Sequence, residues 1–422
     1  MVGMRMLRAG AVLGVLALAG CGGTVQAAQE KTGTGERARV AVADAGALDD
    51  VVAASWALGV ETLQAVDDDA GAVVSPSSLV SALAMLAEGA VDGETAPFDA
   101  ALGASGQERT DAVDALLAAL ARYDGDPALV AAEHPPTTPM VHTRQRVVVD
   151  DDARIAQPYL DRLWRAFGAG VLVTDLASSD GKAALDAWVA LETGGLVDRS
   201  AIVPDESLVT VLQDVVAFAA AWQQPFAEAG TSNAPFAIGG GAGADVPTMH
   251  ALLTVPAVQR DGWVAVRLPY ADDLHADVYL PPDGSDLATD PAGADPQVLS
   301  ALSAALDDAA PVVVRLALPK LALRTTTNLA GVLDELGVGS QARTGVLADG
   351  SPVTLAQATQ QAVLLVDEEG TRAAAVTELG DAGSAAPLVD LEVDVDRPFL
   401  LAVQDGETGW PVFLAAVRDP RG

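Results

Sequence analysis

The chain has 422 residues, and its 24 lysines and arginines against 58 aspartates and glutamates give it a formal net charge of −34. Hydrophobic residues make up 50% of it, more than a disordered chain contains, and a nucleic-acid-binding protein would need a basic face to meet phosphates. The composition therefore indicates a globular protein and excludes both of those classes. The length allows two or three domains or one large core. The single cysteine excludes a disulfide framework and any cysteine-based zinc site.

The first twenty residues have the composition of an export signal. Arg5 and Arg8 precede an uncharged run of about a dozen residues, which is too short to span a bilayer. The run ends in Leu18-Ala19-Gly20-Cys21, which resembles the bacterial lipoprotein box, where the cysteine is lipidated and becomes the mature N-terminus. We therefore expect residues 1–21 to be a lipoprotein signal peptide with its lipid on Cys21. The alternative is an ordinary secretory signal that is cleaved nearby.

Residues 22–46 are rich in glycine, threonine, glutamine and charged side chains, and they show no apolar periodicity. This composition predicts a flexible tether. The folded domain is then expected over residues 47–422. It would be secreted and held by the lipid on the outer face of the cytoplasmic membrane of a bacterial cell.

From residue 47 onward the chain mixes helical and strand signals, which predicts an α+β fold. Leu79, Leu83 and Leu86 recur at helical spacing after Ser75-Pro76, a typical helix start. Residues 312–318 and 362–366 are short runs rich in β-branched and aliphatic residues, and they predict buried strands. The glycine-rich residues 239–243 lack the lysine of a phosphate-binding loop and predict a surface loop.

No catalytic or metal-binding constellation stands out in the sequence. Gly380-Asp381-Ala382-Gly383-Ser384 faintly resembles the nucleophile loop of chymotrypsin-like proteases, but it has no partner histidine motif and no bracing cysteines. We therefore expect no metal, no cofactor and no enzymatic activity, with an unrecognised catalytic triad as the alternative. The histidines lack a metal-binding spacing and are interpreted as core or solvated residues: His134, His142, His250 and His275.

The most informative segment follows the strand-like run at residues 362–366. Small, uncharged residues occupy every second position at Thr371, Ala373, Ala375 and Thr377. Side chains alternate between the two faces of a strand, so this segment could lie in a sheet with that face buried. The pattern therefore predicts a loop that is able to become a strand.

Seven sequence blocks resemble those of the serpins, in the family's order, from about Ala47 to the C-terminus. They include the hinge of the family's reactive-centre loop and its C-terminal signature. The blocks are Ser75-Pro76-Ser77-Ser78 with Ala82 to Leu86; Trp188-Val189 with Thr193-Gly194-Gly195; Trp222, Pro225, Phe226 and Thr231; Leu268-Pro269-Tyr270; Leu318-Pro319-Lys320-Leu321; Glu368 to Ala375; and Asp396 to Leu400 with Gly409 to Leu414.

The resemblance implies one large domain with three β-sheets, surrounding helices and an exposed reactive-centre loop at about residues 368–392. A target serine protease would cleave the loop and be trapped as a covalent acyl-enzyme while the loop inserts into the main sheet. The protein would act as a monomer. A non-inhibitory serpin that serves as a surface binding module is the alternative. The implied hinge residues are Glu368, Glu369, Gly370, Thr371, Ala373, Ala374, Ala375 and Thr377.

Two further regions follow from the resemblance. Ser75 and Ser78 would lie at the shutter under the main sheet, and Trp222 would lie at the breach, where insertion begins. The family usually has an asparagine and a histidine at the shutter, where this chain has Asp214 and Gln360. An aspartate–glutamine hydrogen bond could replace the usual pair, and the pH sensitivity of the histidine would be absent.

The family's spacing from the hinge glycine predicts the scissile bond at Ser384-Ala385, whereas spacing from the C-terminal signature points to Pro387. The bond is therefore expected in a window that includes Gly383, Ala386 and Pro387. These residues are small or proline, so none fills a deep specificity pocket. An elastase-like or subtilisin-like protease is the expected target.

Overall fold

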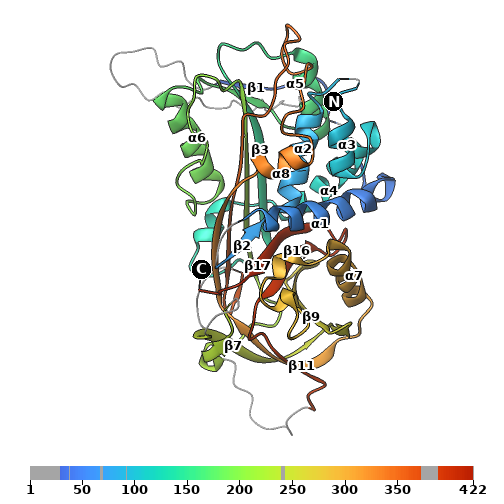
Figure 1. Cartoon of the computed structure of the whole chain (residues 1–422), viewed down its shortest axis with the longest axis vertical. Coiled ribbons are helices and arrows are strands. Elements are labelled where there is room, and N and C mark those ends of the chain that lie inside the picture. Colours follow the sequence, from blue (N-terminus) through green and yellow to red (C-terminus); the bar gives the residue numbers. More distant parts are fainter. Residues whose placement is uncertain are drawn as a thin grey trace, which may run out of the picture.

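A seven-stranded sheet, sheet A, runs along the long axis of the molecule (Figure 1). The computed structural model describes residues 29–37, 39–66, 70–91, 93–238, 243–371 and 388–421. Strands β5 and β13 are parallel and pair directly over part of their length, while the short β14 lies antiparallel to both. In spatial order the strands are β1 (Gln29–Lys31), β4 (Val171–Val173), β3 (Met140–Val149), β5 (Thr210–Ala221), β14 (Gly370–Thr371), β13 (Gln357–Val366) and β12 (Leu321–Asn328).

Two smaller sheets form the other end of the molecule. Sheet B contains β2 (Gly71–Val74), β17 (Pro411–Val417), β16 (Phe399–Asp405), β10 (Leu274–Leu280), β9 (Trp263–Pro269) and β8 (Ala257–Arg260). Every residue of β10, β16 and β17 is buried, as expected for strands covered on both faces. Sheet C contains β15 (Leu391–Asp394), β11 (Val312–Pro319), β7 (Ala244–Val255) and β6 (Ser232–Phe236).

Helices cover both faces of sheet A. Helix α6 lies on one side of the long strands, and α2 packs against β3 and β5 on the other (Figure 1). The helices are α1 (Leu48–Gln64), α2 (Pro76–Ala87), α3 (Ala96–Leu102), α4 (Gly106–Leu120), α5 (Gln157–Phe167), α6 (Ser179–Glu192), α7 (Pro296–Asp307) and α8 (Ala330–Glu335). Short 3₁₀ turns lie at Val42–Asp44, Ala121–Tyr123, Pro127–Ala131, Glu228–Gly230, Asp286–Ala288 and Pro291–Gly293.

Helix α2 begins where the sequence predicts it. The Ser75 hydroxyl accepts a hydrogen bond from the Ser78 N–H, and Pro76 occupies the first turn, where its missing N–H has no cost. Every residue of the helix is buried, and the helix packs against β3 and β5 of sheet A. The strands predicted at residues 312–318 and 362–366 are also confirmed as β11 and the end of β13.

The expected α+β fold with three β-sheets is confirmed, and residues 29–46, which the sequence analysis assigns to a flexible tether, contact the domain. The N-terminal arm, residues 29–46, lies along the domain. Its strand β1 pairs with β4 at the edge of sheet A, and its Thr34 N–H donates to the Asp161 carboxylate at 2.8 Å. A segment of polar composition can therefore lie along the surface of a folded domain instead of moving freely. Within the described residues, no helix is long and apolar enough to cross a membrane.

Candidate functional site

A tight turn joins β13 to β14 and directs the chain back into sheet A. The Asp367 N–H donates to the Gly370 carbonyl at 2.9 Å, and the Asp367 carboxylate accepts from the Glu369 N–H at 3.0 Å. Gly370 lies against β5, where an added Cβ would collide with the Ala220 carbonyl oxygen. Glycine is therefore required here by the close approach of two backbones.

Thr371 already lies between β5 and β13. It pairs with Ala220 on one side and Val366 on the other, and only 2% of its surface is exposed. Its hydroxyl group forms a hydrogen bond with the Tyr270 hydroxyl, and burial raises the pKa of Tyr270 far above its usual value. The sequence analysis places Thr371 at the base of an exposed loop; instead, this residue is buried in the sheet.

Trp222 stacks on Tyr270 next to the hinge, with ring centroids 4.4 Å apart and an interplanar angle of 10°. Its indole N–H donates to the Asp367 carbonyl at 2.9 Å, and its backbone N–H donates to the Glu369 carbonyl at 2.8 Å. Both N–H groups of this buried tryptophan are thus used to hold the turn between β13 and β14. The arrangement is a rigid support for the first residues of the hinge.

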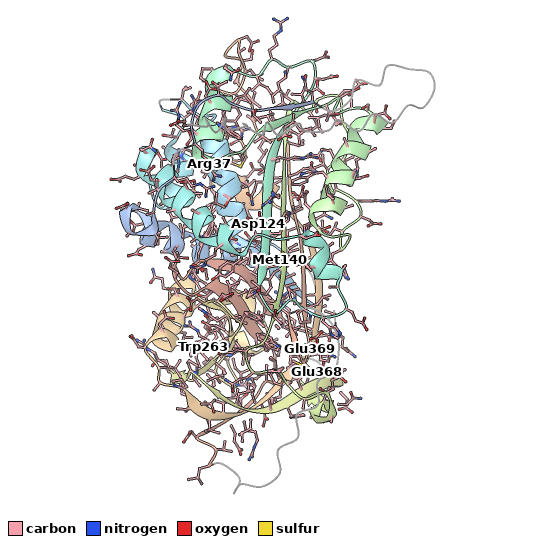
Figure 2. The ribbon with its side chains drawn as sticks, turned by 180° about the vertical axis from the view of Figure 1, so that it is seen from behind. Arg37, Asp124, Met140, Trp263, Glu368 and Glu369 are labelled. Carbon is pink, nitrogen blue, oxygen red and sulfur yellow. The ribbon has the colours of Figure 1, made fainter. Side chains whose placement is uncertain are left out.

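The two hinge glutamates lie at the lower end of the long strands (Figure 2). Glu368 accepts hydrogen bonds from the Thr231 hydroxyl at 2.6 Å and from the Lys320 ammonium at 2.7 Å. Burial alone would raise the pKa of Glu368, but the hydrogen bonds from Lys320 and Thr231 outweigh it and lower the pKa. The side chain of Glu369 lies 3.2 Å from the Nδ1 atom of His134.

At the shutter, the two strands that flank the hinge are both joined to the first turn of α2. The Ser78 hydroxyl on α2 donates to the Asp214 carboxylate on β5. The side-chain amide of Gln360 on β13 accepts from the Ser75 N–H at 2.8 Å and donates to the Ser75 carbonyl at 2.9 Å. The polar groups of this region therefore connect β5 and β13 through α2.

Among the described residues, no charged side chain pairs with the Asp214 carboxyl group. Burial raises its pKa to about 6, although the hydrogen bond from Ser78 and the neighbouring side-chain amides of Gln145 and Gln360 act in the opposite direction. The Gln360 amide forms two hydrogen bonds with Ser75, so Asp214 and Gln360 are joined through the start of α2. A titratable group is therefore present at the shutter even though the histidine is not.

On the opposite face of sheet A, side chains of β3 hold helix α6. His142 lies between the carboxylates of Asp124, at 2.9 Å, and of Glu192 on α6, at 2.6 Å. The Arg146 guanidinium lies 4.3 Å from the centre of the Trp188 ring on α6. These contacts connect α6 to the strand next to β5.

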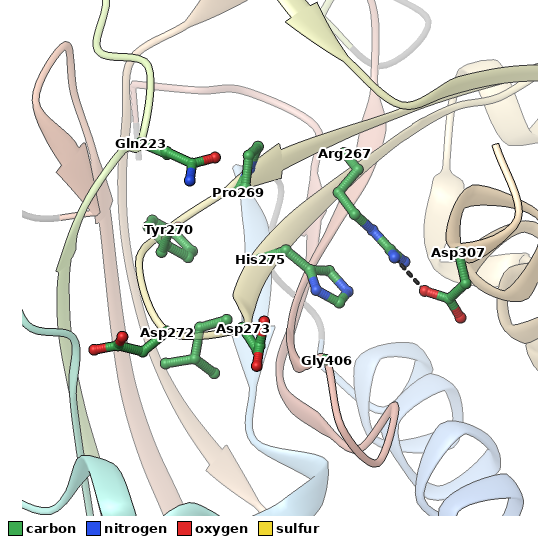
Figure 3. A pocket seen from close by; sticks show the side chains of 10 residues that line it. Gln223, Arg267, Pro269, Tyr270, Asp272, Asp273, His275, Asp307 and Gly406 are labelled. Atoms are coloured by element: carbon green, nitrogen blue, oxygen red, sulfur yellow. Dashed lines mark hydrogen bonds and ion pairs between the residues drawn. The ribbon is translucent and has the colours of Figure 1, made fainter. Parts of the chain in front are cut away.

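A pocket of about 340 Å³ borders the breach, and Figure 3 shows how its side chains lie. Gln223 and Tyr270 line it on the side of the hinge, while the Arg267 guanidinium pairs with Asp307 on α7 across from His275. Tyr270 belongs both to the pocket and to the hinge contact. In the part of the chain that the structure describes, no cluster of histidine, cysteine or acidic side chains is arranged to hold a metal ion.

Several predicted residues lie outside the described residues, so their placement stays a prediction. They are Cys21, the hinge residues Ala373, Ala374, Ala375 and Thr377, and the window of Gly383, Ser384, Ala385, Ala386 and Pro387. On the far side of this gap, Leu388 is 89% exposed and the chain then enters sheet C as β15. Most of the glycine-rich stretch at residues 239–243 is likewise outside the described residues.

Comparison with known proteins agrees with this architecture. The family model described as Serpin (serine protease inhibitor) matches residues 54–420. The chain belongs to the serpin family. Members of this family are generally inhibitors of proteases. Alpha-1-antiproteinase 2 of Equus caballus is 26% identical to this serpin over 361 residues, which are 82% of this chain and 80% of that protein. Alpha-1-antitrypsin 1-1 of Mus musculus is 25% identical over 364 residues, 82% of each chain.

Solved serpin structures share the fold. The native state of the thermophilic serpin tengpin superimposes with a TM-score of 0.75 at 19% identity, covering 92% of this chain and 99% of that chain. Serpin-12 of Manduca sexta gives a TM-score of 0.71 at 20% identity, covering 87% of this chain and 98% of that chain. The arrangement of three sheets and their helices is therefore that of a serpin.

The sequence analysis missed how the hinge of this serpin is held. Tyr270 and Lys320 belong to blocks that resemble the family, but their partners Thr371 and Glu368 lie 101 and 48 residues further along the chain, respectively. One signal was available for Lys320, because the sequence contains only two other lysines, Lys31 and Lys182. No comparable signal identified the hydroxyl pair of Tyr270 and Thr371.

Proposed function

We propose that this serpin inhibits an extracellular serine protease by offering its loop for cleavage and then inserting the loop into sheet A. The observation that carries the proposal is the position of β14. Gly370 and Thr371 already pair antiparallel with both β5 and β13, which is the geometry that a longer inserted strand would continue. Serpin loop insertion is a known example of strand addition to a sheet.

The chemistry of the proposed trap follows from the order of two events. The protease serine attacks the carbonyl carbon at the scissile bond, the peptide bond breaks, and the new N-terminus leaves while an ester joins the serpin to the protease. The freed loop then enters sheet A before water reaches the ester. About a dozen new backbone hydrogen bonds, at a net ~0.5–1.5 kcal/mol each, would supply on the order of 10 kcal/mol.

The alternation of residues in the loop supports insertion. Side chains at every second position from Thr371 would face the interior, and Ala373, Ala375 and Thr377 are small and uncharged. A buried unpaired charge costs several kcal/mol, so this pattern is the one an inserting strand needs. We place the scissile bond at Ser384-Ala385 and infer an elastase-like or subtilisin-like target, since small residues suit shallow specificity pockets.

Incubation with a panel of serine and cysteine proteases tests the proposal. An elastase-like or subtilisin-like enzyme should form a complex that survives denaturing electrophoresis, and mass spectrometry of the released peptide should map the cut between Gly383 and Pro387. A primary cut near Arg372 or Leu391 during productive inhibition would contradict the assigned bond. If no protease of the panel forms a complex, the non-inhibitory alternative replaces the proposal.

The location of the protein is a separate part of the proposal. Lipid on Cys21 would hold this serpin on the outer face of the cytoplasmic membrane of a bacterial cell, where it would protect envelope proteins from extracellular proteases. The support is the run Leu18-Ala19-Gly20-Cys21, in which the only cysteine of the chain occupies the position that a lipoprotein requires.

A further inference from the structure

Asp214 occupies the place where sheet A must open, and the following inference rests on the proposed function. Strands β5 and β13 still pair directly there, with Leu212 opposite Ala358 and Val215 opposite Gln361. Asp214 lies between these two pairs on β5 and is only 7% exposed. An entering strand must separate β5 from β13 at this carboxyl group.

In the described part of the chain, the groups that face Asp214 are neutral. Helix α2 contributes the Ser78 hydroxyl, β13 contributes the Gln360 amide, and β3 contributes the Gln145 amide directly opposite Asp214 in the ladder. Arg144 and Arg146 flank Gln145 along β3 and therefore point to the other face of the sheet. Within the described residues, no charged side chain contributes to the pKa shift of Asp214.

The other titratable groups of this region belong to different surfaces. His142 is on β3, but it contacts Asp124 and Glu192 on the face that α6 covers. His134 lies next to Glu369 at the hinge and is exposed. Variants of these two histidines therefore serve as controls for Asp214.

We propose that the ionisation of Asp214 controls how easily β5 and β13 separate, so that a strand enters sheet A quickly when the carboxyl group is protonated and slowly when it is ionised. An ionised carboxylate only accepts hydrogen bonds, and its bonds with neutral donors are stronger than those of the protonated form. Gln360 on β13 is bonded to Ser75 and Asp214 on β5 to Ser78, and both serines belong to the start of α2. If β13 keeps its bonds to Ser75, β5 can leave β13 only by drawing the Asp214 carboxylate away from the Ser78 hydroxyl. The ionised carboxylate then loses its hydrogen-bond donor.

The direction of the pH effect on unfolding follows from the same burial. Burial raises the pKa of Asp214 in the folded protein to about 6. Folding is therefore accompanied by the uptake of a proton at pH values between the ordinary pKa of aspartate and about 6. The stability that the protonated group contributes is complete below about pH 4, the ordinary range of aspartate. It is lost as the pH rises through about 6.

Unfolding of the full chain and of its Asp214→Asn variant tests the ionisation itself. Asparagine has the same shape without the charge, so the variant provides a reference that does not titrate at this position. Between pH 4.5 and pH 8 the unfolding equilibrium constant of the parent should rise about thirtyfold relative to that of the variant. The rise is about tenfold per pH unit and ends once the pH passes about 6, where the folded protein also releases the proton. A ratio that stays constant with pH would overturn the assignment of a buried, titrating carboxyl group.

Uptake of a fluorescent peptide with the sequence of residues 371–384 tests the opening of the sheet. At pH 7.5 the Asp214→Asn variant should take up the peptide about tenfold faster than the parent, which corresponds to about 1.4 kcal/mol in the barrier. At pH 5 the two rates should agree. Comparing the proteins at each pH cancels the titration of the peptide's own side chains.

Two histidine variants serve as matched controls. His142→Gln and His134→Gln should each change the uptake rate by a factor that does not vary between pH 5 and pH 7.5. If that factor varies for a histidine variant and stays constant for Asp214→Asn, the inference is wrong although the proposed function stands. If neither the parent nor Asp214→Asn takes up peptide at any pH, the proposed function and the control of opening both fail. The unfolding result then still decides whether Asp214 titrates.

Discussion

The hinge residues of this serpin have different tasks, and their surroundings show which substitutions each can accept. Thr371 is buried between two strands with its hydroxyl paired to Tyr270, so the position needs a small side chain with one hydrogen-bonding group. Glu368 needs a negative charge, because an ammonium and a hydroxyl donate to it. Changes at these residues should therefore affect the start of insertion more than the binding of a protease.

Replacing Thr371 with arginine should convert the inhibitor into a substrate. The scissile window is unchanged, so a target protease should still cut it at about the same rate. Because Thr371 already lies between β5 and β13, a guanidinium there would displace the hinge from the sheet in the resting protein. Returning it to the sheet during insertion would cost several kcal/mol, and each 1.4 kcal/mol slows insertion about tenfold. Measuring the moles of serpin consumed per mole of protease inhibited checks this. Thr371→Ser, which keeps the hydroxyl, should remain an inhibitor; efficient covalent complexes with Thr371→Arg would show that insertion is not the mechanism.

Replacing Tyr270 with phenylalanine should loosen the hinge while keeping the ring stacked on Trp222. The change leaves the Thr371 hydroxyl unpaired in a buried site, which should lower the free energy of unfolding by about 1–3 kcal/mol. It should also speed peptide uptake. The matched control is Tyr159→Phe, whose hydroxyl donates to the Met85 carbonyl at 3.3 Å in the core. The Tyr159→Phe control should lose stability without a change in the rate of peptide uptake. Equal uptake rates for the two variants would show that the Tyr270 hydroxyl has no specific role at the hinge.

Replacing Lys320 with methionine should destabilise the protein in a pH-dependent way. Because the pKa of Glu368 is lowered in the folded state, its ionised form contributes stability above its ordinary pKa, and this stability is lost as the pH falls through the folded value. The variant should therefore be less stable at pH 7 by about 1–3 kcal/mol. The difference should shrink below about pH 4. Denaturant unfolding at both pH values measures it, and Lys320→Arg should restore most of the loss.

At the scale of elements, the N-terminal arm adds an edge strand to sheet A and joins parts of the domain that are distant in sequence. The Val40 N–H donates to the Asp114 carboxylate on α4 at 2.9 Å, and the Trp164 indole on α5 donates to the Gly35 carbonyl at 3.2 Å. Burial raises the pKa of Asp114, although the Val40 N–H and Arg37 oppose the shift. The arm thus covers a carboxylate that would otherwise meet water.

Removal of the arm should therefore destabilise the domain. A protein that begins at residue 47 should lose a few kcal/mol, since several hydrogen bonds at a net ~0.5–1.5 kcal/mol each disappear together with the β1 edge strand. Thermal unfolding compares it with a control that begins at residue 29 and retains every arm contact described above. Equal melting temperatures for the two proteins would show that the arm adds nothing to stability.

At the scale of the whole molecule, sheet A connects the hinge, the shutter and the α6 face, so each acts on the same separation of β5 and β13. Gln360 and Asp214 join these strands to α2 on one face, while Arg146 and His142 hold α6 over the neighbouring strand on the other. Opening must break contacts on both faces. In the proposed mechanism, the sheet would therefore stay closed until cleavage frees the loop.

The proposed anchor is tested on the whole chain in membranes. If Cys21 carries lipid, the parent protein should fractionate with membranes and the Cys21→Ala protein should not. The chemical reason is that only the cysteine thiol can form the thioether bond to the lipid. Immunodetection in membrane and medium fractions measures the effect. A Cys21→Ala protein that stays with the membrane would leave the lipoprotein interpretation without support.

The sequence by itself determined the fold through short motifs whose order is enough to identify it. The helix start at Ser75-Pro76 and the strands at residues 312–318 and 362–366 depend on local chemistry, so they could be predicted without any contact. The N-terminal arm could not, because its residues have no periodicity of their own and follow the surfaces of α4, α5 and β4. Analysis of hydrophobic periodicity detects segments that bury their own side chains. The arm was not detected because it contacts the domain mainly through backbone hydrogen-bonding groups.

The candidate site likewise has features that the sequence predicted and features that only the tertiary structure showed. The resemblance to the serpins predicted which residues form the hinge and the shutter, and that Asp214 and Gln360 stand where the family usually has an asparagine and a histidine. Only the tertiary structure decided that Thr371 is already inside sheet A and that Asp214 is buried among neutral donors. A pKa depends on desolvation and on the charges nearby, and both are set by elements that lie far apart in the chain. Sequence therefore determined which groups are present, and packing determined which of them titrate, pair or move.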